Sequence, residues 1–321
     1  MKKIKIFCTL GPATLNKKFL KFAQFQKVDL VRLNMSHLSI VNLKKNINFI
    51  KENSRLNICL DTEGAQIRTK IKKKIFIKKN QKIRIFKNKN FHLYPSDVFQ
   101  KLRVNDTLEL GFNELIIKII KRKINFFEAK CTRQGLLEAN KGVHLVNRQI
   151  KLNFLTTKDY KAIELAKKFE IKNYALSFTN SVNDITKFKK LIPKANKIYK
   201  IETSKALKNF KLLKKKGTEF LIDRGDLSKD ISIEKIPRAQ RMLFEKKDKN
   251  NNIYIATNLL ESMINASHPT RAEANDVYNS IEMGAAGLVL AAETAIGKHP
   301  EDCIIFLKKI ISLSRQKKIK F

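Results

Sequence analysis

Short apolar runs alternate along this chain with longer segments in which apolar residues recur every three or four positions. Runs of the first kind predict strands, and segments of the second kind predict amphipathic helices. Strands that are joined through helices pair in parallel, because each crossover returns the chain to the same edge of the sheet. The predicted strands span residues 4–10, 28–34, 57–61, 174–178, 196–203, 219–226, 253–256 and 287–290.

Helices are predicted between these strands and after the last one. They span residues 15–26, 41–52, 157–168, 183–191, 238–247, 271–283 and 301–314, and a lysine-rich amphipathic segment ending at Gly217 is the eighth. Eight parallel strands with eight helices make a closed (β/α)8 TIM barrel of the α/β class. Such barrels carry their chemistry at the carboxyl ends of the strands, which is where the polar clusters of this sequence fall.

The segment from residue 70 to 141 has a different pattern. Its apolar runs are short, rich in β-forming residues and separated by turn residues, with no helix of the crossover type. We therefore predict a small all-β domain inserted after the third strand, with the barrel in two parts, 1–69 and 142–321. Basic residues alternate with apolar ones in the insert, which suggests an oligonucleotide-binding barrel. Aromatic residues that could stack on bases are sparse, however, so we favour an ordinary basic surface exposed to water.

The chain is strongly basic. It has 67 Lys plus Arg against 29 Asp plus Glu, a net charge of +38. Such an excess is typical of proteins that bind nucleic acid, acidic membranes or anionic substrates. Here the lysines are spread over the whole chain and accompany abundant Asn, Ile and Phe without Trp, as expected of an AT-rich coding sequence. We interpret the charge as composition drift, and a nucleic-acid partner is the disfavoured alternative.

Cysteine usage and hydropathy indicate the compartment. Cys8, Cys59, Cys131 and Cys303 show neither paired spacing nor a metal-type cluster, which predicts a reducing, cytoplasmic environment. No apolar run approaches the roughly 18 residues that a membrane helix requires. Lys5 interrupts the apolar run behind the basic start of the chain, which therefore predicts a first strand rather than a signal peptide.

Three charged residues are candidates for chemistry. In a strand over 196–203, Lys200 and Glu202 project to the same face. Asp226 follows one strand-helix-strand unit later, and carboxylates at the ends of neighbouring strands can hold Mg²⁺ while leaving positions open for a phosphate-bearing substrate. Lys200 would then meet the charge of a transferring phosphoryl group. From these residues alone, a pair of ordinary strand-end salt bridges is an equal alternative.

Short motifs in order along nearly the whole chain support the first interpretation. They are CTLGPA at 8–13, RLNMSH at 32–37, DTEG at 61–64, IRT at 67–69, KGV at 141–143, KIE at 200–202, RGDL at 224–227, ATN at 256–258, LESM at 260–263, PTRAE at 269–273 and ETAIGK at 293–298. With these motifs the chain resembles the pyruvate kinase family. The resemblance implies Mg²⁺-dependent transfer of a phosphoryl group from phosphoenolpyruvate to ADP, giving pyruvate and ATP in the last step of glycolysis.

The resemblance also implies the roles of the substrate-binding residues. Glu202 and Asp226 match the magnesium ligands, and Lys200 matches the lysine that stabilises the phosphoryl group. Arg32 would bind the substrate phosphate, a task suited to a planar guanidinium. The backbone N–H groups of Gly225 and Asp226 would hold the substrate carboxylate with the hydroxyl of Thr257, which also lies on the route of the proton to enolpyruvate.

A potassium site, nucleotide contacts and a lid are implied in the same way. The potassium ligands would be Asn34, Ser36, Asp61 and Thr62. The nucleotide contacts would be Asn34, His37, Arg68 and Lys158. The inserted β domain would be a mobile lid that closes to exclude water. The resemblance leaves the oligomeric state open, with a homo-oligomer as one option.

Several positions depart from the family pattern. After Asp61-Thr62 the family has Lys-Gly-Pro-Glu, where this chain has Glu63-Gly64-Ala65-Gln66, and Gln66 puts potassium dependence in question. Where the family has Asp-Asp-Gly in the lid, this chain has Glu109-Leu110-Gly111. The loss of the acid at Leu110 is expected to impair closure of the lid. Three further positions differ. Asp223 replaces the family's alanine before Arg-Gly-Asp, Thr203 replaces its asparagine after Lys-Ile-Glu, and Ala291-Ala292 replaces its Ser-Gly before Glu-Thr.

The resemblance ends with the eighth helix, so the family's C-terminal regulatory domain is expected to be absent. Two interpretations follow. One is an active, shortened pyruvate kinase, favoured because Lys200, Glu202, Asp226, Arg32 and Thr257 are all present. The other is a non-catalytic descendant kept as a binding or regulatory protein, which the departures near the charged centre favour.

Overall fold

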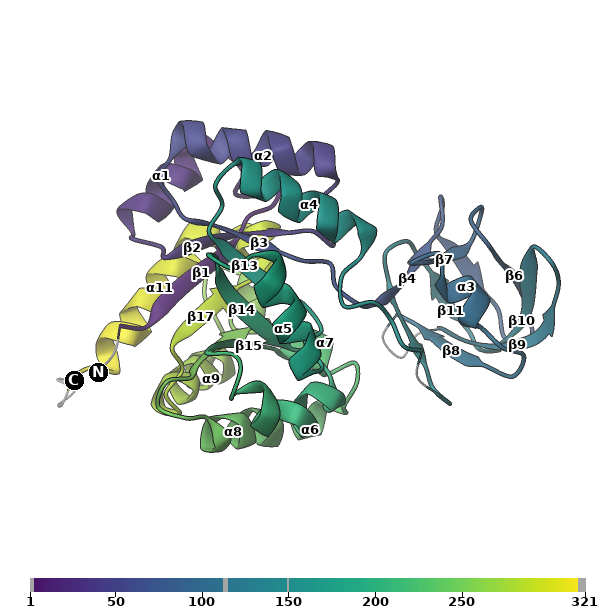
Figure 1. Cartoon of the computed structure of the whole chain (residues 1–321). Helices are drawn as coiled ribbons and strands as arrows, with labels where there is room; N and C mark the ends of the chain where they lie inside the picture. The colour runs from purple at the N-terminus through teal and green to yellow at the C-terminus, as the bar shows by residue number, and fades with distance from the viewer. Residues whose placement is uncertain (1–2, 112–114, 149, 317–321) are drawn as a thin grey trace. The chain divides into compact units, whose positions relative to one another are not determined.

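The computed structural model of the chain describes residues 3–111, 115–148 and 150–316 (Figure 1). The chain divides into two compact units. The first combines Met1–Gly64 with Thr157–Phe321, and the second is Ala65–Thr156. No helix in the described ranges is both long enough and apolar enough to cross a membrane.

The first unit is built on a closed barrel of parallel strands, which confirms the predicted fold class. Going round the barrel, the order of the described strands is β1, β17, β16, β15, β14, β13, β3 and β2. Their bounds are β1 (Lys5–Thr9), β2 (Leu30–Asn34), β3 (Ile58–Asp61), β13 (Asn173–Leu176), β14 (Asn196–Ile201), β15 (Glu219–Asp223), β16 (Asn252–Ala256) and β17 (Gly287–Leu290).

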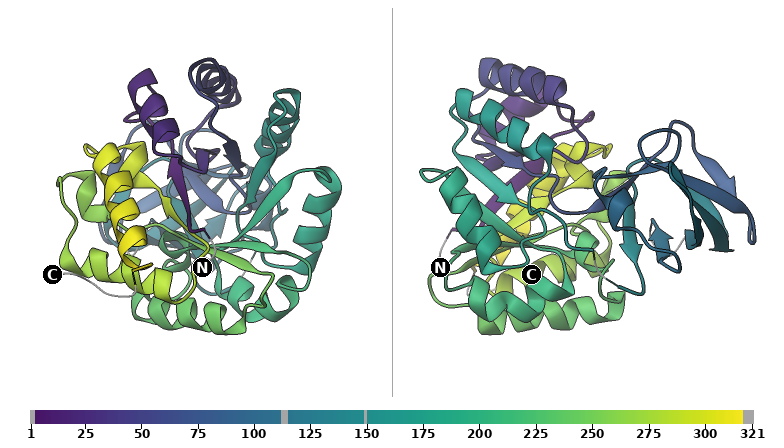
Figure 2. Two further views of the ribbon diagram at one scale, coloured as in Figure 1. Left: turned by 90° about the vertical axis from the view of Figure 1, so that its left-hand side faces the viewer. Right: turned by 45° about the vertical axis from the view of Figure 1, so that its right-hand side comes forward.

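Helices surround these strands (Figure 2, left view). The longer ones are α1 (Lys17–Phe25), α2 (Ile40–Asn53), α4 (Thr157–Lys168), α5 (Val182–Leu191), α6 (Ser204–Leu213), α8 (Ile236–Lys246), α9 (Arg271–Glu282) and α11 (Pro300–Leu313). Polar residues define where several of them begin, because a side-chain oxygen accepts a free N–H group of the first turn. Asn16, Ser39 and Thr203 do this for α1, α2 and α6.

Alternation along the strands places an apolar layer inside the barrel and a charged layer above it. Cys59, Ile198 and Leu221 belong to the buried interior cluster. Two residues further along each of these strands, and therefore on the same face, lie Asp61, Lys200 and Asp223. Arg32 of β2 lies beside Cys59 of β3, one level lower, and its side chain reaches the charged layer by pairing with Asp61 at 3.0 Å. The charged layer is thus fixed by strand register at the carboxyl end of the barrel.

One predicted boundary near this layer was wrong. A strand was expected over 219–226, but β15 ends at Asp223 and the short helix α7 (Arg224–Leu227) follows at once. Asp223 adopts an extended backbone conformation as the N-cap of α7, and its side chain accepts the N–H of Asp226. Asp226 therefore lies in a helical turn rather than in the strand.

The second unit contains a closed barrel of its own. Its described strands follow the order β10, β6, β7, β4, β12, β8 and β9, and β5 pairs with β11 in a separate two-stranded sheet. The elements are β4 (Ile67–Lys70), β5 (Ile75–Ile77), β6 (Lys82–Phe86), β7 (His92–Tyr94), α3 (Val98–Lys101), β8 (Thr107–Leu110), β9 (Leu115–Arg122), β10 (Phe126–Arg133), β11 (Gly135–Leu137) and β12 (Gly142–Leu145).

This unit is wider than the insert expected over 70–141. Its first and last strands, β4 and β12, pair with each other, so residues before 70 and after 141 belong to it. Leu110, where the family motif has an acid, is 1% exposed and lies in its apolar core. The side chain at that position therefore packs inside the second unit.

Gly287 of β17 lies so close to the neighbouring strand β1 that a larger residue there should destabilise the barrel. A Cβ atom at Gly287 would lie 2.6 Å from the carbonyl oxygen of Lys5 and 2.8 Å from Cδ1 of Tyr254. We expect Gly287→Ala to lower the free energy of unfolding by about 1–3 kcal/mol, the usual cost of overpacking. Urea unfolding followed by circular dichroism measures it. As a control, Glu282→Ala at an exposed position of α9 should change stability by less than about 0.5 kcal/mol. Equal effects of the two substitutions would contradict the prediction.

A second prediction concerns the start of α9. Thr270 and Glu273 form a capping box, and Glu273 also accepts the N–H of Ser262 at 2.7 Å. Partial burial would raise the pKa of Glu273, but hydrogen bonds from Ser262 and Thr270 outweigh it and lower the pKa below 4.5. An acid with a lowered pKa contributes stability that is present above its ordinary pKa and lost as the pH falls through the folded value.

Glu273→Gln should therefore cost about 1 kcal/mol at neutral pH, as for other helix caps. The difference from the unmodified protein should shrink as the pH falls below 4.5. Urea titrations at several pH values test this, with Glu282→Gln at the exposed end of the same helix as control. A loss that does not depend on pH would show that the carboxylate charge has no part in the cap.

Candidate active site at the carboxyl end of the barrel

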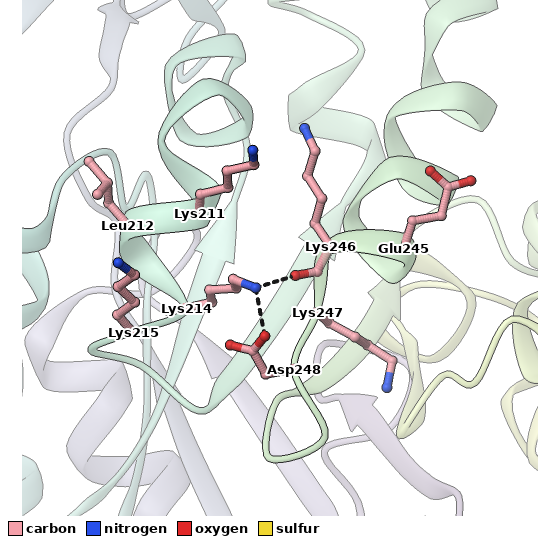
Figure 3. A pocket seen from close by; sticks show the side chains of 8 residues that line it. All are labelled: Lys211, Leu212, Lys214, Lys215, Glu245, Lys246, Lys247 and Asp248. Atoms are coloured by element: carbon pink, nitrogen blue, oxygen red, sulfur yellow. Dashed lines mark hydrogen bonds and ion pairs between the residues drawn. The ribbon is translucent and has the colours of Figure 1, made fainter.

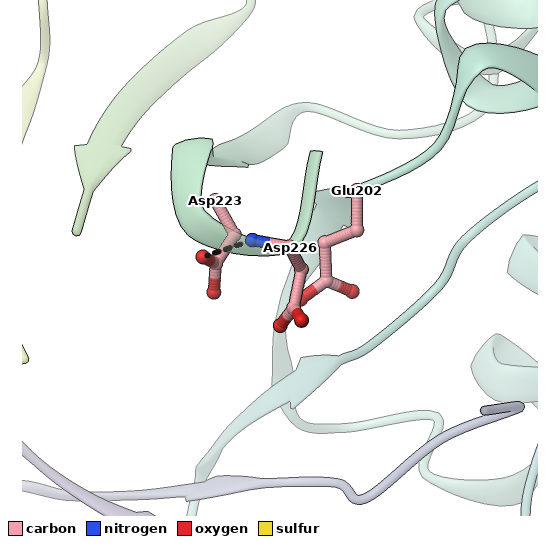
Figure 4. Close-up of side chains that lie close together, drawn as sticks. All are labelled: Glu202, Asp223 and Asp226. Atoms are coloured by element: carbon pink, nitrogen blue, oxygen red, sulfur yellow. Dashed lines mark hydrogen bonds between the residues drawn. The ribbon is translucent and has the colours of Figure 1, made fainter. Parts of the chain in front are cut away.

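Three carboxylates meet where β14, β15 and α7 end or begin (Figure 4). One oxygen atom from each of Glu202, Asp223 and Asp226 lies within 4.8 Å of the others. Glu202 and Asp223 are buried, and Asp226 is partly exposed. Three oxygen donors at this spacing can hold a divalent cation such as Mg²⁺, which is bound through one or two carboxylates and keeps positions for a substrate.

Lys200 lies among the buried acids. Its Nζ is 2.7 Å from Glu202, 3.2 Å from Asp223 and 3.4 Å from Asp61, and its side chain is 4% exposed. Burial would lower the pKa of Lys200, but the carboxylates of Asp61, Glu202 and Asp223 outweigh it and raise the pKa. The ammonium is therefore charged at every physiological pH.

Arg32 provides a second buried cation. Its Nη2 atom pairs with Asp61 at 3.0 Å, while Nε and Nη1 are buried without a hydrogen-bond partner. Burial disfavours the charged guanidinium, but Asp61 and Asp223 outweigh it and raise its pKa. A buried, charged guanidinium with two unpaired donors is suited to binding an anion, because unpaired buried donors are costly.

The acids respond differently to this environment. Burial raises the pKa of Glu202 to about 8, Asp223 and Asp226 add to the rise, and Lys200 opposes it. Burial would also raise the pKa of Asp223, but Lys200 and Arg32 outweigh it and lower the pKa. Burial is the main cause of the raised pKa of Glu202, although Lys200 Nζ lies closer to it, at 2.7 Å, than to Asp223, at 3.2 Å. A bound cation would favour the charged form of Glu202.

A strained turn follows β16 at the same end of the barrel. Thr257 has a φ of 67° and Asn258 a φ of 53°, and a left-handed backbone is an outlier for a β-branched residue. Arg224 holds this turn by donating to the carbonyl of Thr257 at 2.8 and 3.0 Å and to that of Asn258 at 2.9 Å, and it pairs with Asp276 at 2.6 Å. The Gly225 N–H donates to the Thr257 hydroxyl oxygen at 2.7 Å.

The residues predicted to bind potassium lie on neighbouring strand ends. Asn34 and Asp61 face each other on the paired strands β2 and β3. The Asn34 side-chain oxygen accepts the N–H of Ser36 at 2.9 Å, and the Thr62 hydroxyl oxygen accepts the N–H of Ser177 at 3.0 Å. Strand pairing brings the four predicted residues to one edge, and their binding of potassium stays a prediction.

The residues predicted to contact the nucleotide are divided between the two units. Asn34, His37 and Lys158 belong to the first unit, and Arg68 belongs to β4 of the second. Lys158 forms an ion pair with Glu63, with 2.7 Å between Nζ and Oε2. Glu63 replaces a lysine of the family motif, so this substitution gives Lys158 an acidic partner within the chain.

Four residues that organise these groups were given no role from the sequence. Asp159 accepts the N–H groups of Glu63 at 2.7 Å and Gly64 at 3.0 Å, and Ser177 lies 3.3 Å from both Asp61 and Lys200. Asp223 and Arg224 were noted only as a departure and as part of a motif. Asp223 follows Leu221 on the inner face of its strand, so alternation was the signal that could have placed it in the charged layer.

A lysine-lined hollow of about 550 Å³ lies elsewhere on the first unit (Figure 3). It is lined by residues 211, 212, 214, 215 and 245–248, which lie in the last turns of α6 and α8 and directly after them. In a (β/α)8 barrel those ends adjoin the amino ends of the next strands, away from the catalytic edge. Lys214 already pairs there with Asp248 at 2.6 Å. The hollow is therefore not part of the carboxylate site.

Comparisons with known proteins agree with this architecture. A family model described as pyruvate kinase, barrel domain, matches residues 1–304. The pyruvate kinase of Thermotoga maritima is 31% identical, with 100% of this chain and 72% of the relative covered. That of Methanocaldococcus jannaschii is 33% identical over 98% of this chain and 70% of the relative. The pyruvate kinase of Buchnera aphidicola subsp. Schizaphis graminum is 31% identical over 97% of this chain and 69% of the relative.

The carboxylate cluster predicts binding of a divalent cation that can be measured without any substrate. Mn²⁺ serves as a spectroscopic probe of a Mg²⁺ site, and we expect one Mn²⁺ to bind per chain in electron paramagnetic resonance titrations. Glu202→Gln and Asp226→Asn should each lower the affinity roughly tenfold or more, because hard cations depend on the number of charged oxygen ligands. Glu245→Gln, an exposed acid in the lysine-lined hollow, is the control. Unchanged affinity in both site variants would exclude the cluster as the metal site.

Proposed function

Because the chain belongs to the pyruvate kinase family, we propose that it transfers the phosphoryl group of phosphoenolpyruvate to ADP, giving pyruvate and ATP. The single observation that carries this proposal is the buried charged layer. In it, Lys200 lies within 3.4 Å of three carboxylates, and Arg32 keeps two donors without a partner. The carboxylates favour a bound cation and the free donors of Arg32 favour a bound anion, so the site suits a metal ion together with a phosphate group.

We assign Mg²⁺ to Glu202 and Asp226. Their oxygen atoms are the hard ligands that Mg²⁺ requires, and a bound cation would favour the charged form of Glu202, whose pKa is raised by burial. When bound, Mg²⁺ supplies positive charge that polarises the phosphoryl oxygens and stabilises the negative charge of the transition state. The potassium site of Asn34, Ser36, Asp61 and Thr62 remains part of the proposal.

The chain's own cations would bind and orient the phosphoryl group. Arg32 would donate its free N–H groups to the phosphate, and Lys200 would stabilise the oxygens that gain charge as the bond to the enol oxygen breaks. The phosphorus forms its new bond to the terminal phosphate of ADP. His37, Arg68 and Lys158, with Asn34, are proposed to contact the nucleotide.

The remaining product is the enolate of pyruvate, which takes up a proton at carbon. Thr257 lies at the strained turn after β16, and its hydroxyl accepts the N–H of Gly225 at 2.7 Å. We assign the proton route to this hydroxyl, and we assign the substrate carboxylate to it together with the N–H groups of Gly225 and Asp226. The strain at Thr257 supports a functional role, because such conformations cluster at active sites.

A second candidate is a non-catalytic member of the family that binds a ligand or partner. The observation that favours it is the pairing of Lys158 with Glu63 at 2.7 Å, since an acid replaces a family lysine beside a proposed nucleotide contact. A protein of this kind would retain metal or nucleotide binding and would not turn phosphoenolpyruvate over. Cytoplasm, the compartment of glycolysis, is the proposed location for either candidate.

The proposed reaction is tested with purified protein, phosphoenolpyruvate, ADP, Mg²⁺ and K⁺, with pyruvate formation coupled to NADH oxidation. We expect turnover that is abolished by chelating Mg²⁺. Lys200→Met should lower kcat by roughly 10²–10³-fold, as when other preorganised charges are removed from a transition state. Lys205→Met, an exposed lysine of α6, is the matched control and should retain activity.

Circular dichroism shows whether each variant is folded, and replacing KCl by choline chloride measures the contribution of K⁺. Turnover in the unmodified protein no higher than in folded Lys200→Met would reject the enzymatic function. Binding of Mn²⁺ or ADP without turnover would instead support the non-catalytic candidate.

A further inference from the structure

Asp223 occupies donors that the proposed function assigns to the substrate. One of its oxygens, Oδ1, accepts the N–H of Asp226 at 3.4 Å and lies 3.2 Å from the hydroxyl oxygen of Thr257. The other, Oδ2, pairs with Lys200 at 3.2 Å. The side chain is buried, at 4% exposed. An internal carboxylate therefore already has the environment that suits a ligand carboxylate.

A second carboxylate at this place meets two obstacles. The N–H of Asp226 and the hydroxyl of Thr257 would have to be shared between two acceptors or released by Asp223. In addition, two carboxylates that share one buried site repel each other, and the repulsion is large where water is excluded. Alanine, which the family pattern has at this position, presents neither obstacle.

The phosphate half of a substrate is less affected. Arg32 offers its free N–H groups on the side of the layer formed by β2, and its carboxylate partner is Asp61. Binding of a phosphate there requires no hydrogen bond now held by Asp223. The structure thus separates a blocked carboxylate position from an open phosphate position.

We propose that Asp223 is a specificity-determining residue that competes with the carboxylate of the substrate, so that the chain binds carboxylate-bearing phosphate esters more weakly than its other site residues allow. The inference rests on the proposed function, because it uses the substrate position assigned there. Asp223 does so through its own contacts with Asp226, Thr257 and Lys200. Its loss releases the N–H of Asp226 and removes the acceptor 3.2 Å from the Thr257 hydroxyl, while Lys200 keeps Asp61 and Glu202 as partners.

The test is direct binding by calorimetry in the presence of Mg²⁺, with two small probes. Phosphoglycolate carries both a phosphate and a carboxylate, and ethyl phosphate carries the phosphate alone. Asp223→Ala should bind phosphoglycolate roughly tenfold or more tightly than the unmodified chain, the scale of one relieved charge repulsion. Its affinity for ethyl phosphate should rise by less than that, because the phosphate needs no hydrogen bond that Asp223 now holds and gains only from the removed charge.

Asp223→Ala removes the N-cap of α7 and could fail to fold, so Asp223→Asn is measured as a second variant. Asparagine is as good an N-cap as aspartate, so this variant keeps the start of α7 and removes only the charge. It should show a smaller gain for phosphoglycolate than Asp223→Ala, since the amide still occupies the N–H of Asp226.

Three results would overturn the inference. The first is unchanged affinity for phosphoglycolate in both variants, and the second is an equal gain in affinity for both probes. The third is weaker binding of both Mn²⁺ and phosphoglycolate, which would make Asp223 a metal ligand. Turnover of phosphoenolpyruvate is measured separately. A gain in phosphoglycolate binding without turnover supports the competition and rejects the enzymatic function, whereas turnover without any gain rejects only the competition.

Discussion

The ammonium of Lys200, held inside the barrel by Asp61, Glu202 and Asp223, is the interaction on which the site depends. Two buried cations, Lys200 and Arg32, face these three buried carboxylates, and the partly exposed Asp226 adjoins them. Charges cannot be left unpaired in a low dielectric. The cluster of Glu202, Asp223 and Asp226 favours a metal ion, while the free donors of Arg32 favour an anion. In the proposed function, a metal ion and a phosphate would meet these two demands together.

Contacts between distant segments hold the strand ends that carry this layer. Glu293, which is 1% exposed, accepts the N–H groups of Leu260 at 3.2 Å and Ala291 at 2.7 Å, and so joins the segments that follow β16 and β17. Thr294 donates to the carbonyl of Thr9 at 2.9 Å, which closes the ring between the last strand and the first. These buried hydrogen bonds fix the rim of the barrel, so that side chains from different strands reach one another at constant distances.

Two charge changes alter this rim without changing its architecture. Glu63 replaces a lysine of the family pattern and pairs with Lys158, and Asp223 replaces an alanine and pairs with Lys200. Each introduces an acid beside a cation that the proposed function uses. The cost of burying either acid is offset by the cation beside it, which explains how the barrel tolerates them. Their consequence falls on the ligands: Glu63 reduces the charge that Lys158 can offer to a nucleotide, and Asp223 competes with a ligand carboxylate.

The sequence by itself determined the strands, their inward faces and the inserted β domain. Alternation placed Lys200 and Glu202 on one wall, and the ordered motifs pointed to the family. Tertiary structure alone decided which atoms meet: the ion pairs of Asp223, the hold of Arg224 on the strained turn at Thr257, and the pairing of β4 with β12 that widens the second unit. The physical reason is that strand periodicity is local, whereas these contacts join residues far apart in the chain and exist only once the barrels have closed.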